Sequence, residues 1–436
     1  LGVLTIRGGM TSHAAMVARG LGLPGIVGAS EIHYNRRKRT ITVPDGREFT
    51  EDDIVTIDGT TGTVLAGSVD LLEPSLDDMF QTLLSWADEA RDIGVRANAD
   101  TVEEAQVALT FAAEGIGLCR TEHMFFEEDR LTVMREMIFA ETPKGRAAAL
   151  ERLVPMQLSD FTRLFKLLDG KPVCIRLFDP PLHEFLPHTR EGMRELSDAM
   201  GLPLSQVERR IDALAEFNPM LGLRGVRLGV TLPEIYDAQA RAIFMATVQA
   251  IGEDNHVTPE IMIPLVSARR EVELVQGKIE AVAAEIRTKT GVDFSYKLGV
   301  MVETPRAALR AGDIADHASF LSVGTNDLTQ MTYGLSRDDA GRFMTDYVHQ
   351  GVYAEDPFHR LDIDGVGELL KLGAERGRAA RPDVTLSICG EHGGDADSIA
   401  FCREAGFHYV SCSPFRVPVA RLAAAQIAIK ARNPHR

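Results

Sequence analysis

The sequence predicts an α/β protein in which a (β/α)8 barrel follows a small N-terminal α/β domain. Three observations support this fold class. From residue 95 onward, short apolar runs alternate with long helical segments. These runs are continuously apolar, as expected for parallel strands that are buried on both faces. No GxGxxG fingerprint opens this region, which weakens the alternative of a doubly wound open sheet.

The N-terminal region is expected to hold short strands and one helix, followed by a linking helix. "GIVG" (25–28) and "TITV" (40–43) predict strands, and residues 53–67 predict a hairpin around "DGTTG". A helix is expected from Pro74 to Gly94. We therefore expect three segments, namely residues 1–70, a linker helix within 71–94, and a barrel over 95–436. Since the chain begins at Leu1 without a methionine, we expect the first segment to be N-terminally incomplete.

The barrel strands are predicted from eight apolar runs. In chain order they are "VRANA", "IGLCR", "VCIRLFD", "GVRLG", "IMIPLV", "KLGVMVE", "FLSVG" and "LSICG".

Composition excludes several classes of partner. The formal charge is −16, with 47 basic and 63 acidic residues, whereas a nucleic-acid surface needs clustered lysine and arginine. The basic run "RRKR" (36–39) is interpreted as a solvated turn. No apolar stretch is long enough to span a membrane, and no signal segment is present. Five scattered cysteines predict reduced thiols and a cytoplasmic protein.

Polar side chains stand where the predicted strands end, which is where (β/α)8 barrels carry their chemistry. Each has a plainer alternative. An arginine can form a surface ion pair, Glu303 can cap a helix, the pair Asn326 and Asp327 can form a turn, and Cys389 can be a buried apolar residue. The strand-end residues are Arg120, Arg176, Asp179, Glu303, Asn326, Asp327, Cys389, Glu391 and His392.

Together these residues suit a small phosphorylated acid. Two arginines can grip phosphate and carboxylate in a bidentate manner. Glu303 and Asp327 offer the hard oxygen ligands that Mg²⁺ prefers. Cys389 could give or take a proton at carbon, although a thiol is an unusual general acid.

The N-terminal stretch "GGMTSHAAMVARG" (8–20) places His13 at an expected helix start. Thr11 or Ser12 can cap that helix, and backbone N–H groups there favour an anion such as a phosphate carried on the imidazole. The alternative is a capped helix with an exposed histidine.

At these motifs the chain resembles the pyruvate, phosphate dikinase family. "GGMTSHAAMVARG" is similar to its phosphohistidine motif. The barrel motifs of the family are similar to "GLCRTEHMF", "RLFDPPLHEFLP", "NPMLGLRG", "VGTNDLTQMT", "CGEHGGD" and "YVSCSPFRVPVARLAAAQ".

The resemblance implies a role for each matching residue. His13 would carry the phosphoryl group on a mobile domain, and Thr11 matches a position that plant members phosphorylate for control. Arg120 and Arg176 would hold the phosphoryl group, and Glu303 and Asp327 would bind Mg²⁺. Cys389 would protonate the enolate carbon, with Cys412 as a rival thiol interpreted as structural. Substrate contacts would come from Arg120, Arg176, Glu303, Gly324, Thr325, Asn326 and Asp327.

The implied activity is Mg²⁺-dependent interconversion of phosphoenolpyruvate and pyruvate through phosphohistidine. Two alternatives stay open: a phosphocarrier that passes phosphate to a protein partner, and a non-catalytic module that senses phosphoenolpyruvate. Complete family members carry an N-terminal ATP-grasp domain. We expect this sequence to lack it, so ATP and phosphate would be used only by a missing or separate domain. The family also implies a homodimer formed through the barrel.

Overall fold

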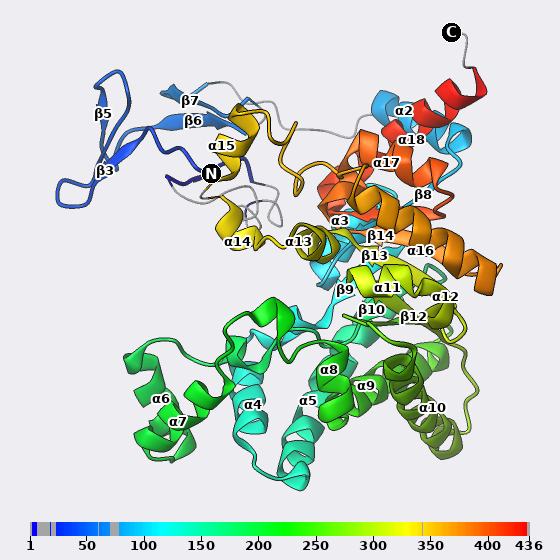
Figure 1. Ribbon diagram of the computed structural model, residues 1–436. Coiled ribbons are helices and arrows are strands. Elements are labelled where there is room, and N and C mark those ends of the chain that lie inside the picture. Colours follow the sequence, from blue (N-terminus) through cyan, green and yellow to red (C-terminus); the bar gives the residue numbers. More distant parts are fainter. Residues whose placement is uncertain are drawn as a thin grey trace.

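Eight parallel strands close into a barrel in the computed structural model of the chain, which describes residues 2–6, 18, 23–59, 61–69, 78–341 and 343–433 (Figure 1). Each strand pairs with its neighbours in chain order, and β15 closes the ring against β8. The predicted (β/α)8 barrel is confirmed. Its strands are β8 (Gly94–Asn98), β9 (Ile116–Arg120), β10 (Val173–Arg176), β11 (Pro259–Ile263), β12 (Lys297–Val302), β13 (Phe320–Gly324), β14 (Thr385–Cys389) and β15 (Tyr409–Cys412).

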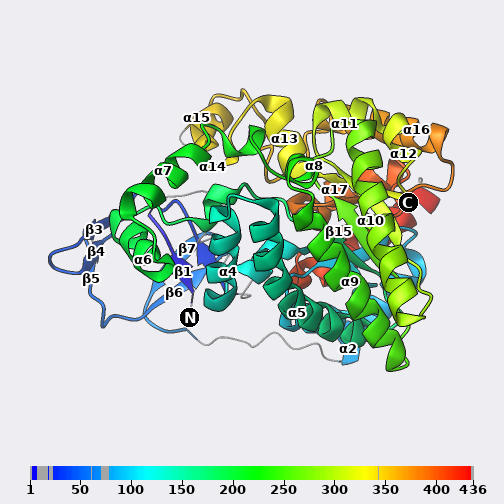
Figure 2. The same ribbon diagram turned by 90° about the horizontal axis from the view of Figure 1, so that it is seen from below.

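The helices that connect these strands surround the barrel in both ribbon views (Figures 1 and 2). The outer helices are α3 (Val102–Thr110), α5 (Pro143–Leu168), α9 (Glu234–Gly252), α10 (Arg269–Thr290), α11 (Pro305–Leu309), α12 (Ala311–Ala315), α16 (Val366–Ala380), α17 (Ala396–Glu404) and α18 (Val417–Arg432).

Three connections are enlarged by further helices. β9 is followed by η1 (Thr121–Phe125) and α4 (Glu128–Phe139). β10 is followed by η2 (Leu182–Phe185), α6 (Arg190–Met200), α7 (Leu204–Leu214), η3 (Pro219–Leu221) and α8 (Val226–Thr231). β13 is followed by α13 (Thr325–Tyr333), α14 (Arg337–Ala340) and α15 (Met344–His349). Two short turns, η4 (Glu391–Gly394) and η5 (Pro414–Arg416), follow β14 and β15.

One predicted strand is wrong. "GVRLG" (225–229) is not a strand, because Gly225 adopts a positive φ of 57° and the next residues form α8. The eighth strand is instead β15, which is not among the eight predicted strands. Consequently the strands that lead to Glu303, Asp327 and Cys389 are the fifth, sixth and seventh of the barrel.

The helix expected over 74–94 is shorter at its C-terminal end than predicted. Its described part, α2 (Asp78–Ala90), ends at Ala90, and Gly94 begins β8. α2 is tied to α18, because the Arg421 guanidinium donates to the Asp88 carboxylate at 3.0 Å and to the Leu84 carbonyl at 3.3 Å. None of the helices described in the structure is both long and apolar enough to cross a membrane.

The described N-terminal residues form three small sheets, which confirm the strands expected there. Asn35 fixes the "RRKR" segment as a turn, because its side-chain oxygen accepts N–H bonds from Arg37 and Lys38. Both views place the β3–β5 sheet at the end of the molecule opposite α10 and α16 (Figures 1 and 2). The sheets are β1 (Val3–Leu4) with β2 (Gly25–Ile26), β3 (His33–Asn35) with β4 (Thr40–Thr42) and β5 (Glu48–Phe49), and β6 (Val55–Asp58) with β7 (Thr63–Ala66).

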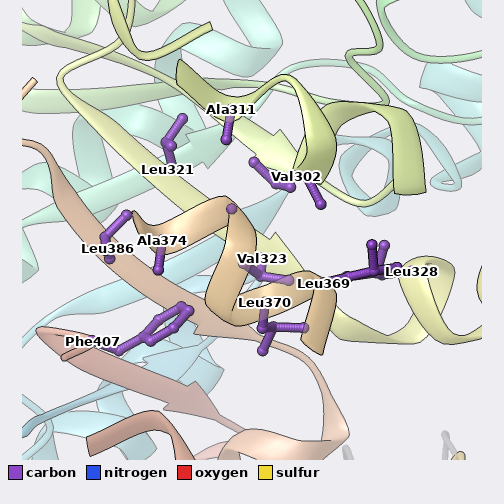
Figure 3. Close-up of a pocket in the computed structure, with 12 residues that line it drawn as sticks. Val302, Ala311, Leu321, Val323, Leu328, Leu369, Leu370, Ala374, Leu386 and Phe407 are labelled. Carbon is purple, nitrogen blue, oxygen red and sulfur yellow. The ribbon is translucent and has the colours of Figure 1, made fainter. Parts of the chain in front are cut away.

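Alternate residues of each barrel strand face the helices, and the others face the barrel axis. Leu321 and Val323 of β13 and Leu386 of β14 line an apolar pocket beneath α16 (Figure 3). No polar side chain lines it, so it belongs to the packing layer between strands and helices. The strand residues that alternate with these apolar positions therefore point toward the barrel axis. These inward positions carry the candidate active site.

Candidate active site

The barrel mouth brings together the sequence-predicted residues that the structure describes. Each lies at the carboxyl end of a strand or within the first turn that follows it. Arg120, Arg176, Gly324 and Cys389 end β9, β10, β13 and β14, Glu303 directly follows β12, and Thr325, Asn326 and Asp327 open α13. His13 and Thr11, the expected phosphoryl carrier and regulatory position, lie outside the described residues.

Arg120 is held by a buried carboxylate at the end of the neighbouring strand. The Asp100 carboxylate accepts the Arg120 backbone N–H at 2.6 Å and its guanidinium at 3.3 Å. His123 contacts the same carboxylate at 2.8 Å. Burial alone would raise the pKa of Asp100, but Arg120 and His123 outweigh it and lower that pKa to about 2. Arg120 therefore does form an ion pair, but its partner is a buried carboxylate and not a surface one.

Arg176 is buried and sits between two carboxylates. One guanidinium nitrogen bonds Glu122 and another lies 3.2 Å from Asp179. Its Nε and one Glu122 oxygen are buried without a hydrogen-bond partner among the described residues. Burial favours the neutral form, yet Glu122, Asp179 and Glu303 keep the pKa of Arg176 well above its usual range. The side chain therefore stays charged, with donor capacity left for a ligand.

A third arginine, Arg224, completes the cationic set. Its guanidinium donates to Asp179 at 2.6 Å and to Asp327 at 3.0 Å. The sequence predicts no role for Arg224, because it stands directly before the predicted strand "GVRLG" and not at the end of a strand. The real segment is the loop between η3 and α8, which carries Arg224 to the mouth.

Asp179, Glu303 and Asp327 converge as a carboxylate triad, with one oxygen of each within 4.8 Å of the others. Burial, reinforced by Asp179 and Asp327, raises the pKa of Glu303 well above its usual range. Three hard oxygen donors at this spacing match the ligands that Mg²⁺ takes in proteins. A divalent cation would also relieve the repulsion that raises the Glu303 pKa, so the donor set fits Mg²⁺.

The helix-cap alternative for Glu303 is wrong. Thr304 caps α11 instead, because its hydroxyl accepts the Ala307 N–H. The Glu303 carboxylate accepts the Leu265 N–H at 2.5 Å. Leu265 has a positive φ of 57°, which is uncommon for a branched residue and aims this N–H at the carboxylate. The side chain is thereby directed to the mouth.

The two candidate thiols face opposite sides of the barrel wall. Cys389 packs inside the barrel with Leu118, Cys174, Met262, Met301 and Phe320. Its sulfur accepts a hydrogen bond from Ser322 at 3.2 Å. Burial raises the pKa of Cys389 to about 11, against the opposing Ser322 bond, so the group is a protonated thiol at neutral pH.

Cys412 ends β15, and its strand neighbour Ser411 faces the axis, donating to Asn98 at 2.5 Å. Cys412 therefore points outward and belongs to the main core between strands and helices. Burial raises the pKa of Cys412 to about 12.

The first turn of α13 is anchored by His392, which follows β14. The Thr325 hydroxyl lies 2.7 Å from His392 Nδ1, and both side chains are fully buried. A Cβ on Gly390 would approach Thr325 Oγ1 to 2.4 Å, so only glycine permits this contact. The Asn326 side-chain oxygen is buried without a hydrogen-bond partner among the described residues, as a group awaiting a ligand would be.

Sequence reasoning missed several residues of this arrangement. Asp100 stands two residues after β8, so the strand-end rule could have found it. Asp179 and His392 were noted at strand ends but received no role. Glu122 and Arg224 gave no signal of their own, because only the folded chain brings them to Arg176 and the triad.

Comparison with known proteins agrees with this geometry. Residues 75–429 match the family described as PEP-utilising enzyme, PEP-binding domain, where PEP is phosphoenolpyruvate. Residues 1–62 match its mobile domain. Proteins named pyruvate, phosphate dikinase are similar to the chain: 54% identical in Rhizobium meliloti and 49% in both Clostridium symbiosum and Giardia intestinalis.

These alignments cover 98–99% of this chain but only 48–49% of each relative. The chain thus spans about half the length of the relatives it matches. Because the PEP-binding domain accounts for most of its residues, the chain belongs to the family of PEP-utilising enzymes.

Proposed function

We propose that the chain carries the half-reaction of a pyruvate, phosphate dikinase that interconverts phosphoenolpyruvate and pyruvate through phosphohistidine. One observation carries the proposal: the carboxylate triad Asp179, Glu303 and Asp327 contacts Arg176 and Arg224 at the barrel mouth, and Arg120 ends the strand beside that of Arg176. The interior of the same barrel holds Cys389. The relatives named pyruvate, phosphate dikinase support it.

Arg120 and Arg176 bind the phosphoryl group in transfer. Both guanidinium groups are held by carboxylates before substrate arrives, so little reorganisation is needed as charge shifts between the donor and acceptor atoms. In the direction of pyruvate, the P–O bond of phosphoenolpyruvate breaks and a P–N bond to His13 forms. The enolate of pyruvate is left at the mouth.

Glu303 and Asp327 would hold Mg²⁺, with Asp179 beside them. Bound there, the ion would supply positive charge that stabilises a developing enolate. Gly324, Thr325 and Asn326 contact the substrate from the start of α13, with Asn326 on the carboxylate. A Cβ at Gly324 would meet the Glu303 carboxylate at 2.9 Å, so glycine keeps this approach open.

Cys389 delivers a proton to the methylene carbon of the enolate. A proton donor must be protonated before it acts, and burial keeps this thiol protonated at neutral pH by raising its pKa to about 11. The thiolate formed then regains a proton from solvent, and the reverse sequence removes a proton from the methyl group of pyruvate.

Three further parts of the proposal rest on the family alone. ATP and phosphate are used by a domain outside this sequence, two copies associate through the barrel, and Thr11 is a position for regulatory phosphorylation.

The test is labelling of the full-length protein with phosphoenolpyruvate that carries ³²P, in the presence of Mg²⁺. We expect an acid-labile, base-stable label on the peptide that contains His13, and none in His13→Ala. Label on another residue, or none in folded full-length protein, would refute the proposal. Binding without labelling would indicate a sensor instead, and transfer of label to a second protein a phosphocarrier.

A further inference from the structure

The described residues between α13 and α16, 334–341 and 343–365, form an excursion with a small core of its own. Ala340, Met344 and Phe358 are buried in this core, and Leu335, Phe343 and Tyr353 pack against them. The rings of Tyr333 and Tyr353 meet edge to face at 5.4 Å, which joins the end of α13 to the excursion. The excursion is therefore an ordered unit attached to the helix that carries the substrate-contacting residues.

Two hydrogen-bond relays connect this excursion to the first turn of α13. In one, Gln330 donates to Asp327 at 3.1 Å and accepts the Arg337 N–H at 2.7 Å. In the other, His392 lies between Thr325, at 2.7 Å from Nδ1, and the Pro357 carbonyl, at 3.1 Å from Nε2. The second relay also involves the loop after Cys389, because His392 belongs to η4.

The chemistry of the partners fixes the proton positions in the second relay. The Pro357 carbonyl can only accept, so Nε2 of His392 carries a proton. Burial lowers the pKa of His392, which keeps the ring neutral and leaves Nδ1 as an acceptor. The Thr325 hydroxyl must then donate to Nδ1, and it has no proton left for a substrate carboxylate.

We propose that His392 is a positioning residue, which fixes the Gly324–Asp327 turn against both the Cys389 loop and the excursion by accepting from Thr325 and donating to Pro357. A corollary is that Thr325 contacts the substrate through its backbone and not through its hydroxyl. This inference rests on the proposed function for its kinetic consequences, but not for the hydrogen bonds themselves.

The two ring nitrogens can be tested separately in the full-length enzyme. The side-chain oxygen of His392→Asn can replace Nδ1 as acceptor for Thr325, whereas the side-chain N–H of His392→Gln can replace Nε2 as donor to Pro357. His392→Ala removes both. We expect His392→Ala to lower kcat/KM for phosphoenolpyruvate by about 10- to 100-fold, as loss of a supporting partner typically does. His392→Asn should recover most of the lost kcat/KM, whereas His392→Gln should recover little of it.

His408 offers a matched control at the opposite end of the barrel. Its Nδ1 accepts the Leu386 N–H at 2.9 Å. His408→Asn and His408→Gln should leave kcat/KM unchanged. Better recovery by His392→Gln than by His392→Asn would overturn the proposal, as would equal values for the two, or wild-type kcat/KM in His392→Ala.

A double-mutant cycle separates this inference from the proposed function, because it needs no substrate. The thermal stabilities of His392→Ala, Thr325→Val and the double variant should show that the two effects are coupled. A cycle with Thr325→Ser, which keeps the hydroxyl group, should show no loss of the hydrogen bond to His392. Additive effects would overturn the hydrogen bond. If the double-mutant cycle shows coupling but the wild-type protein shows no turnover, the proposed function fails while the hydrogen bond between His392 and Thr325 stands. If His392→Ala does not fold, the comparison of Asn with Gln still decides the outcome.

Discussion

The two ends of the barrel interior hold charged clusters of opposite design. At the amino ends of the strands, the Glu260 carboxylate is bound by Arg96 at 2.7 Å and by Lys297 at 3.2 Å. The Arg96 guanidinium also lies 3.9 Å above the Tyr409 ring. At the mouth, the side chains that form close contacts are the carboxyl groups of Asp100, Glu122, Asp179, Glu303 and Asp327 and the guanidinium groups of Arg120, Arg176 and Arg224.

The difference indicates that one cluster stabilises the barrel and the other binds a ligand. The Glu260 cluster matches its acid with cations from the chain, as expected at the face of a barrel that serves stability. At the mouth these carboxyl groups outnumber the guanidinium groups, and the Glu303 carboxyl has a raised pKa. A bound cation would offset this surplus of carboxyl groups, so the mouth is suited to bind a ligand.

Loss of the bound cation is expected to have the largest effect at the mouth. Glu303→Gln or Asp327→Asn should abolish Mg²⁺-dependent binding of oxalate, a mimic of the pyruvate enolate, because Mg²⁺ would lose one of its anionic ligands. Isothermal titration with and without Mg²⁺ measures this. Wild-type affinity in both variants would show that the triad does not hold the ion.

One arginine from each end provides the next test. Arg120→Ala should slow phosphoryl transfer on the order of 10²-fold or more, because a preorganised cation is lost, while Mg²⁺-dependent oxalate binding persists. Arg96→Met should instead lower the free energy of unfolding by about 3 kcal/mol, because Glu260 loses a buried partner, and leave the transfer rate of the folded protein unchanged. Rapid-quench kinetics and chemical denaturation measure the two effects. Loss of stability without slower transfer in Arg120→Ala, together with slower transfer in folded Arg96→Met, would contradict the roles assigned to the two ends.

A smaller effect concerns acid stability at the mouth. The pKa of Asp100 is about 2 in the folded chain, below the value of about 3.9 for an unfolded chain. Its stabilising contribution is therefore complete above about pH 5 and is lost as the pH falls through 4 toward 2, by about 2.6 kcal/mol in total. Asp100→Asn should flatten the pH dependence of unfolding in this window. An unchanged slope would mean that Arg120 and His123 do not hold the carboxylate.

The sequence predicted the barrel and most of its mouth for one physical reason. Parallel strands buried on both faces leave continuous apolar runs, and the residues that follow them gather at one end. Arg120, Arg176, Glu303, Asp327 and Cys389 were found in this way, and the structure brings them together at the mouth.

The failures have physical reasons too. "GVRLG" has the apolar composition of a strand, but the positive φ of Gly225 turns the chain into α8. β15 is only four residues long and stands inside a segment noted as a motif. Glu122 stands 54 residues before its partner Arg176, so only the folded barrel brings the two side chains together. The direction of Cys389 and Cys412 depends on strand register, which periodicity in so short a run does not fix.

The central claim is that the inward face of the barrel mouth performs the carbon chemistry, so the two thiols test it most directly. Exchange of the methyl hydrogens of pyruvate with deuterium from solvent can be followed by NMR in full-length Cys389→Ala and Cys412→Ala. Both changes replace a buried thiol with a smaller apolar group. We predict that Cys389→Ala stops the exchange while keeping Mg²⁺-dependent oxalate binding, and that Cys412→Ala exchanges at the wild-type rate. Wild-type exchange in Cys389→Ala together with its loss in folded Cys412→Ala would contradict the account.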